Sequence, residues 1–63
     1  MAYNTMKKLI MNANARLRTG EWSWEEYDDY KETQSRKLDV FYAAGRLTDE
    51  QYTELISLWV EEE

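Results

Sequence analysis

The chain has 63 residues, eight basic and thirteen acidic side chains, a net charge of −5, and no Cys, His or Pro. A chain this short forms at most one domain and buries only about 60% of the surface that its unfolded form exposes, so its core is thin. The composition excludes disulfides, ordinary zinc sites and His- or Cys-based catalysis, and the acidic balance argues against nucleic-acid binding, which depends on neutralising phosphates.

The first predicted helix spans about residues 4–19. Apolar side chains recur there at three- and four-residue steps and form one stripe: Tyr3, Met6, Ile10, Ala13 and Leu17. Lys7-Lys8 and the apolar residues after them mimic a signal peptide, but that apolar stretch is much shorter than the roughly 7–15 residues required. The longest apolar run, 40–44, is also far too short to span a membrane. We therefore expect no membrane association and a cytosolic protein.

Two glycines, Gly20 and Gly45, open an internal repeat. After each glycine come any residue, a large apolar residue, Ser or Thr, any residue, Glu, Glu or Gln, and Tyr. A glycine supplies the left-handed backbone that closes a helix. Two pairs then have the capping-box spacing that starts the next helix, and they are Ser23 with Glu26 and Thr48 with Gln51. The repeat predicts two helix–turn–helix corners.

The central helix is expected from about residue 24 to 44. Residues 31–37 contain nothing apolar, which could indicate a loop, but they also contain no Gly or Pro. The apolar face stays in phase across this gap when each residue is rotated by about 100°. Eight side chains share that face: Trp24, Tyr27, Tyr30, Lys31, Gln34, Leu38, Phe41 and Tyr42. The polar pair within it is either a snorkelling Lys31 with Gln34 in a wet gap, or a register-setting device at an oligomer interface.

The last helix is expected from about residue 49 to 60. Four side chains should face inward, with Trp59 mostly buried: Tyr52, Leu55, Ile56 and Trp59. The glutamates at 61–63 lie at the unfavourable end of the helix dipole and should fray. The sequence thus predicts one all-α domain over 1–63, either an antiparallel three-helix bundle or two hairpins that share the long central helix.

No residue pattern indicates catalysis. The carboxylate pairs Glu25/Asp29 and Glu50/Glu54 fall on polar helix faces at helix starts, where solvation and the helix dipole explain them. The serines lack a partner base, and the isolated glycines form no phosphate-binding loop. We therefore expect a non-enzymatic protein without a cofactor or a metal.

Aromatic residues make up 14% of the chain, and they can form either the core or an interface. Met11, Val40 and Leu58 project away from the main apolar stripes of their helices. They are either singly exposed side chains or part of a surface for a partner. The candidate interaction surface comprises Trp22, Trp24, Tyr27, Tyr30, Met11, Val40 and Leu58.

The stretch 41–55 reads Phe-Tyr-Ala-Ala-Gly-Arg-Leu-Thr-Asp-Glu-Gln-Tyr-Thr-Glu-Leu. It resembles the closing segment of short XkdX-type proteins from phage and prophage tail-gene regions. It is also similar to SHOCT-type short helical domains, with the pattern Gly, apolar, Thr, any, Glu, aromatic. Gly20-Glu21-Trp22-Ser23 resembles the first XkdX corner. XkdX-like proteins place their two corners about three helical turns closer, and whole inserted turns would preserve the helix face. The resemblance implies a phage or prophage origin and a small protein-binding role.

The leading hypothesis is a phage-type protein, in the bacterial host cytosol or the virion, that binds a protein partner or a second copy of itself. The alternative is an acidic inhibitor that mimics nucleic acid in a basic groove of a host protein. Its phosphate surrogates would be Glu25, Glu26, Asp28, Asp29 and Glu32. Mimicry should weaken steeply with salt, whereas aromatic packing should not. A DNA-binding helix–turn–helix ranks last, because the second and third helices begin with acidic residues.

Overall fold

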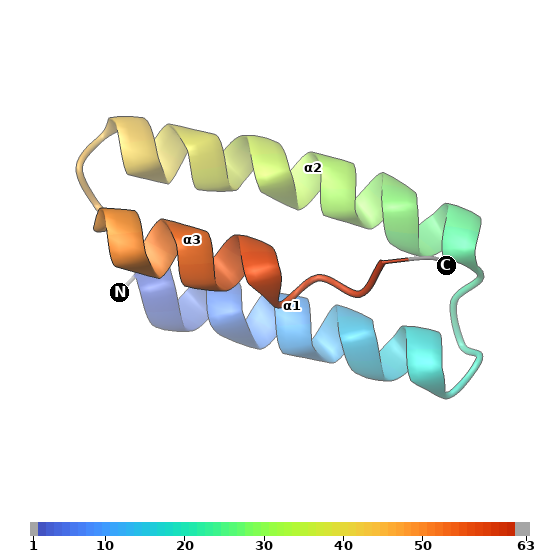
Figure 1. Ribbon diagram of the computed structural model, residues 1–63. Coiled ribbons are helices and arrows are strands. Elements are labelled where there is room, and N and C mark those ends of the chain that lie inside the picture. Colours follow the sequence, from blue (N-terminus) through green and yellow to red (C-terminus); the bar gives the residue numbers. More distant parts are fainter. Residues whose placement is uncertain (1, 62–63) are drawn as a thin grey trace.

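The computed structural model describes residues 2–61 and contains the helices α1 (Ala2–Arg18), α2 (Trp24–Ala43) and α3 (Asp49–Ser57). α2 runs antiparallel to both α1 and α3 (Figure 1). Each helix contacts the other two, and the bundle measures 35 × 19 × 16 Å. The all-α prediction is confirmed. Direct packing of α3 on α1 identifies the arrangement as a closed bundle and not an open pair of hairpins.

Both corners have the predicted local structure. Gly20 and Gly45 adopt φ values of +81° and +76°. At the second corner the N–H of Gly45 donates to the carbonyl of Tyr42 at 3.0 Å, and the N–H of Arg46 donates to that of Phe41 at 2.9 Å. These are the two hydrogen bonds of a Schellman motif. Each following helix starts with a complete capping box, formed by Ser23 with Glu26 and by Thr48 with Gln51.

Substitution of Gly45 by Ala should destabilise the fold by about 1 kcal/mol. A Cβ built at Gly45 meets no atom within 4 Å, so the cost is the positive φ alone. Gly45→Asn should cost less, because Asn tolerates the left-handed region. Urea unfolding of the three proteins measures this, and equal midpoints for the Ala variant and the wild type would contradict the backbone explanation.

The core lies along the facing stripes of the three helices and extends into the C-terminal segment. Its buried hydrophobic members are Met6, Ile10, Ala13, Tyr27, Leu38, Leu47, Leu55 and Trp59. Trp59 is 6% exposed, which confirms its predicted burial. Leu38 is buried beyond the polar stretch of α2, so the phase of the apolar face is preserved across that stretch, as predicted.

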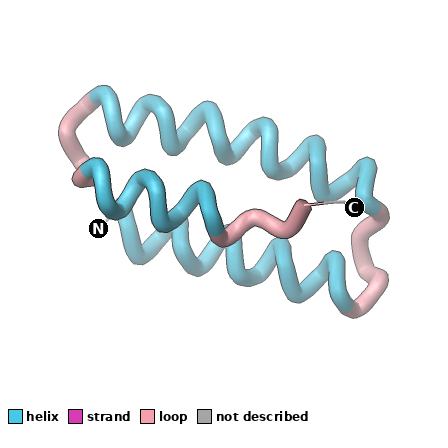
Figure 2. Tube along the Cα trace, in the orientation of Figure 1, coloured by secondary structure: helices cyan, strands magenta, loops and turns pink. Residues whose placement is uncertain are grey.

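The C-terminal end of the chain departs from the prediction. α3 ends at Ser57 instead of about residue 60, and the chain then runs without helical structure beside α1 and α2 (Figure 2). Asn14 Nδ2 donates to the carbonyl of Leu58 at 2.8 Å, and the N–H of Val60 donates to Tyr27 Oη at 2.8 Å. A helix continued to residue 60 would have paired the N–H of Val60 but left the carbonyl of Leu58 without an intrahelical partner. The side chains of Asn14 and Tyr27 satisfy both groups, so the helix can stop early.

Two side-chain orientations in this region were predicted incorrectly. Ile56 is 45% exposed, because its neighbour Leu55 occupies the inward position of the short helix α3. Leu58 is half-buried against the core instead of projecting away, because it follows the end of the helix. Of the predicted frayed tail, Glu61 is exposed and non-helical, and residues 62 and 63 lie outside the described residues.

Candidate functional site

Tyr27 does not belong to the interaction surface to which the sequence assigned it. It is 0% exposed, and its hydroxyl donates to Asn14 Oδ1 at 2.5 Å while accepting the N–H of Val60. Its ring lies edge-on to those of Trp24 and Trp59, with centroids 5.9 and 5.8 Å away. Tyr27 therefore serves the core, and through its hydroxyl it links the C-terminal segment to Asn14 of α1.

Trp22 and Tyr30 do lie together at the surface of the first corner. Their ring centroids are 4.9 Å apart with an interplanar angle of 53°, and both side chains are half-buried. The guanidinium of Arg16, at the end of α1, stands 5.0 Å from the Trp22 ring. Arg16 Nε also pairs with a Glu21 carboxylate oxygen at 3.3 Å. Three segments thus converge on one partly exposed aromatic pair.

A shallow groove begins at this pair and follows α2. We call it the Trp22–Gln34 groove, and it is lined by Trp22, Glu26, Asp29, Tyr30, Thr33 and Gln34. Gln34 is 5% exposed, and among residues 2–61 its Oε1 has no hydrogen-bond partner. A buried carbonyl oxygen left unpaired costs free energy, so it is a strong acceptor for any donor that reaches it.

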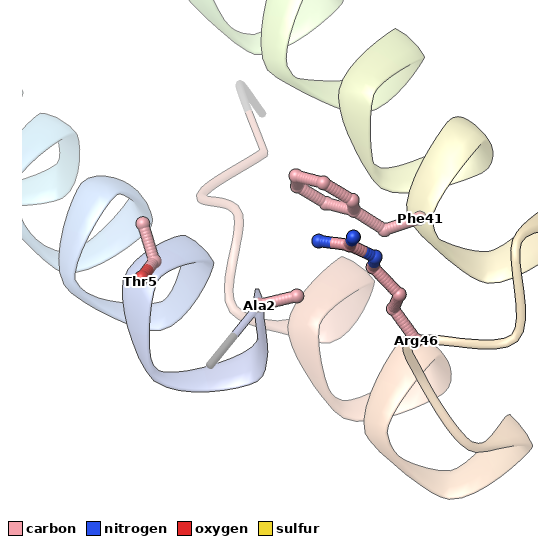
Figure 3. A pocket seen from close by; sticks show the side chains of 4 residues that line it. All are labelled: Ala2, Thr5, Phe41 and Arg46. Atoms are coloured by element: carbon pink, nitrogen blue, oxygen red, sulfur yellow. The ribbon is translucent and has the colours of Figure 1, made fainter.

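A second, separate hollow lies where α1 and α2 meet near the start of α1. Thr5, Leu9 and Arg16 share one flank of α1, because residues four and seven apart project to the same side of a helix. Phe41 and Arg46 extend toward the first turn of α1 and line this hollow with Ala2 and Thr5 (Figure 3). We call the surface that includes Ala2, Thr5, Leu9 and Arg16 on α1, and Phe41 and Arg46 beside them, the α1–α2 seam.

α3 covers the opposite flanks of the same two helices. Tyr3 Oη hydrogen-bonds the carboxylate of Glu54, and Lys7 Nζ lies 3.7 Å from it. On the other side, Tyr52 Oη donates to Asp39 Oδ1 at 2.5 Å. Since these partners lie on the other side of each helix from Leu9 and Phe41, the α1–α2 seam is left uncovered by α3.

The other predicted surface residues are dispersed. Val40 is 65% exposed and borders a small apolar hollow with Phe41, beside the seam. Met11 is exposed on α1 among Lys7 and Lys8, apart from the aromatic corner. Trp24 is half-buried and packs on Tyr27. The structure therefore brings together Trp22 and Tyr30, and places Val40 at the far end of the same seam.

A second aromatic pair, which the sequence did not single out as a pair, lies at the other corner. The rings of Tyr42 and Tyr52 stack with centroids 4.4 Å apart and an interplanar angle of 17°. Tyr42 Oη donates to Asp49 Oδ1 at 2.5 Å. Donation to a carboxylate favours the protonated phenol, so hydrogen bonds to Asp49 and Asp39 raise the pKa values of Tyr42 and Tyr52. Tyr42 and Tyr52 lie on the two helices that flank Gly45, so their positions along those helices, counted from this corner, could have predicted the pair.

These phenols should make the fold sensitive to alkali. The pKa values of Tyr3, Tyr42 and Tyr52 are raised by hydrogen bonds to carboxylates, and that of Tyr27 by burial, from an ordinary 10.0. The folded state then holds these protons more tightly than the unfolded state, so the stabilisation is complete below about pH 10 and is lost as pH rises through the raised values. Urea midpoints should be flat from about pH 7 to 9 and fall above about pH 10. A midpoint that rises in alkali would contradict this prediction.

The acidic side chains on the first half of α2 lie at the surface. The five candidate phosphate surrogates are all exposed: Glu25, Glu26, Asp28, Asp29 and Glu32. Within residues 2–61, no group of three or more carboxylates is arranged to hold a metal ion. The described helices include none with the length and apolar character needed to cross a membrane.

No protein-family model matches this chain, and comparisons with curated proteins and with solved structures found no significant match. Function is therefore inferred from the chemistry of the α1–α2 seam and the Trp22–Gln34 groove.

Proposed function

We propose that this protein is a small, non-enzymatic protein-binding module whose α1–α2 seam receives its partner. The observation that carries the proposal is the row of half-buried aromatic side chains, Trp22, Tyr30 and Phe41, along a seam that α3 leaves uncovered. Aromatic side chains with one exposed edge are the usual energetic centres of protein interfaces. The exposed Val40 extends the same surface.

The proposed setting is a phage or prophage, in the host cytosol or the virion. It is supported by the resemblance of the two glycine corners to those of XkdX-type proteins. Each corner consists of a glycine at positive φ followed by a capping box. The partner is either another protein or a second copy of this chain.

Selection from a random peptide library on the full chain tests the module. Bound peptides should lose about tenfold or more in affinity for Thr33→Arg, because Thr33 is exposed and lines the groove. The matched control is Thr53→Arg, at an exposed position on α3, and it should change affinity less than about twofold. Failure to enrich any peptide, or equal binding to both variants, would count against the module.

Light scattering behind size exclusion, at two protein and two salt concentrations, tests whether the partner is a second copy. A dimer that persists at high salt would identify self-association through the apolar seam, because aromatic packing is insensitive to screening. A monomer of 7.6 kDa at both concentrations would assign the seam to a different protein.

An acidic inhibitor is the second candidate, favoured by the exposed acidic side chains on the first half of α2. Such a protein would displace nucleic acid from a basic groove, and its affinity would fall steeply with ionic strength. Competition with a DNA duplex for bacterial nucleases and RNA polymerase, measured at about 50 and 300 mM salt, tests this mechanism. Displacement that is independent of salt would contradict it.

A further inference from the structure

Within residues 2–61 two buried side chains keep an unpaired polar atom, Trp59 at Nε1 and Gln34 at Oε1. Of these two, Gln34 lines the Trp22–Gln34 groove. It is 95% buried by the fold, yet its Oε1 accepts no hydrogen bond from residues 2–61. Since an unpaired buried acceptor is costly, a ligand that brings a hydrogen-bond donor into the groove regains that cost on binding.

The charge of the groove selects a positively charged donor. Glu26 and Asp29 both line it and are both exposed. Residues 21–32 as a whole carry six acidic side chains and one lysine. The nearby Arg16 is paired with Glu21 at 3.3 Å, so it does not neutralise Glu26 and Asp29 directly. A cation that enters the groove would gain Coulomb energy there, and an anion would be repelled.

The rings of the groove favour a guanidinium over an ammonium. Trp22 and Tyr30 offer partly exposed faces, and a planar guanidinium stacks on such faces more readily than a lysine ammonium does. The chain already holds one guanidinium, that of Arg16, 5.0 Å from the Trp22 ring. A guanidinium also presents five N–H donors in one plane, enough to bond Gln34 Oε1 and a carboxylate at the same time.

We propose that the Trp22–Gln34 groove binds an arginine side chain of a protein partner. Its guanidinium packs against Tyr30 and pairs with the carboxylate of Asp29. The side-chain amide of Gln34, whose Oε1 is buried in the free protein, turns toward the groove and accepts a hydrogen bond from the same guanidinium. This inference rests on the proposed protein-binding function, and it specifies the chemistry of one residue of the partner. It also gives Gln34, in the polar stretch 31–37 of α2, a role in recognition.

The test is a nuclear magnetic resonance titration of the full chain with the peptide acetyl-Gly-Arg-Gly-amide. The matched peptide carries citrulline, which has the shape of arginine without its charge. We expect the arginine peptide to shift the indole N–H of Trp22 and the side-chain amide of Gln34 saturably. The citrulline peptide should bind with an affinity at least about fivefold lower. Equal shifts from both peptides, or shifts confined to other regions, would overturn the proposal.

Two variants and a control separate recognition from general attraction. Asp29→Asn and Gln34→Met should each weaken the arginine peptide about two- to fivefold. Asp28→Asn removes the same charge from an exposed position that does not line the groove, and it should change binding less than about twofold. Equal weakening by Asp28→Asn and Asp29→Asn, in variants with the wild-type circular dichroism, would show nonspecific attraction and overturn the site.

Failure of this inference can be told apart from failure of the proposed function. If library peptides without arginine bind the chain and lose affinity for Thr33→Arg, the binding module is supported and the arginine site is overturned. If no peptide binds the seam at all, the module itself is refuted.

Discussion

Replacement of Trp59 by Ala is expected to destabilise the protein by about 3–5 kcal/mol, the usual cost of truncating a buried tryptophan. Proteins of this size are stabilised by roughly 0.05–0.15 kcal/mol per residue. The loss is therefore comparable to the whole stability of a chain of 63 residues. Trp59 has this large effect because it is 6% exposed and lies in a segment that has no helical structure of its own.

The packing around Trp59 explains why no neighbour can replace it. Its ring contacts that of Tyr27 edge-on, with centroids 5.8 Å apart, and it fills the end of the bundle that α3 is too short to cover. Urea unfolding followed by circular dichroism measures the effect. Val40→Ala, at a site 65% exposed, is the control and should cost less than about 0.5 kcal/mol. Similar midpoints for both variants would show that the C-terminal segment does not stabilise the bundle.

The corners and helix starts were predictable because they depend on local chemistry. A glycine at positive φ, a capping hydroxyl and a Glu or Gln three residues later act within one turn, so sequence spacing contains the whole signal. The ends of α1 and α2 accordingly lie within two residues of their predicted positions. The bundle, in contrast to open hairpins, depends on contacts between α1 and α3, which no local pattern encodes.

The end of α3 was predicted incorrectly because its cause is distant in sequence. Asn14 and Tyr27 bind the backbone of residues 58 and 60 and draw the chain out of its helix. Asn14 could not be singled out from the sequence, because an asparagine beside an apolar stripe is usually an exposed side chain. The same contacts explain why Tyr27 was wrongly assigned to the interaction surface. A tyrosine hydroxyl is compatible with an interface, and the partners that bury this one, Asn14 and Val60, are distant in sequence.

The candidate site was only partly predictable. Trp22 and Tyr30 were identified by residue type, and the polar interruption at Gln34 was identified by its place on an apolar face. That these side chains line one groove depends on the angle at which the first corner joins α2, and the sequence does not give this angle. The unpaired state of Gln34 Oε1 depends on every side chain around it. Residue type and helical phase therefore located the unusual residues, and the packing of the helices brought them into one site.

Substitution of Tyr27 by Phe should destabilise the protein by about 2–3 kcal/mol, although it removes a single oxygen atom. The hydroxyl donates to Asn14 Oδ1 at 2.5 Å and accepts the N–H of Val60 at 2.8 Å, so its loss leaves two partners without their bond. Desolvation of groups that remain buried and unpaired costs about 1–3 kcal/mol. Tyr30→Phe, at a half-buried ring on the surface, is the matched control and should change stability by less than about 0.5 kcal/mol.

A double-mutant cycle shows whether this hydroxyl couples α1 to the C-terminal segment. Tyr27→Phe and Asn14→Ala should be non-additive by about 1 kcal/mol, because each removes the same hydrogen bond. Amide exchange at Val60 should accelerate in Tyr27→Phe, since its N–H loses its acceptor, while exchange in the middle of α2 should change only with global stability. Strict additivity together with unchanged exchange at Val60 would mean that Trp59 packing alone holds the segment. The hydroxyl would then have no part in closing the bundle.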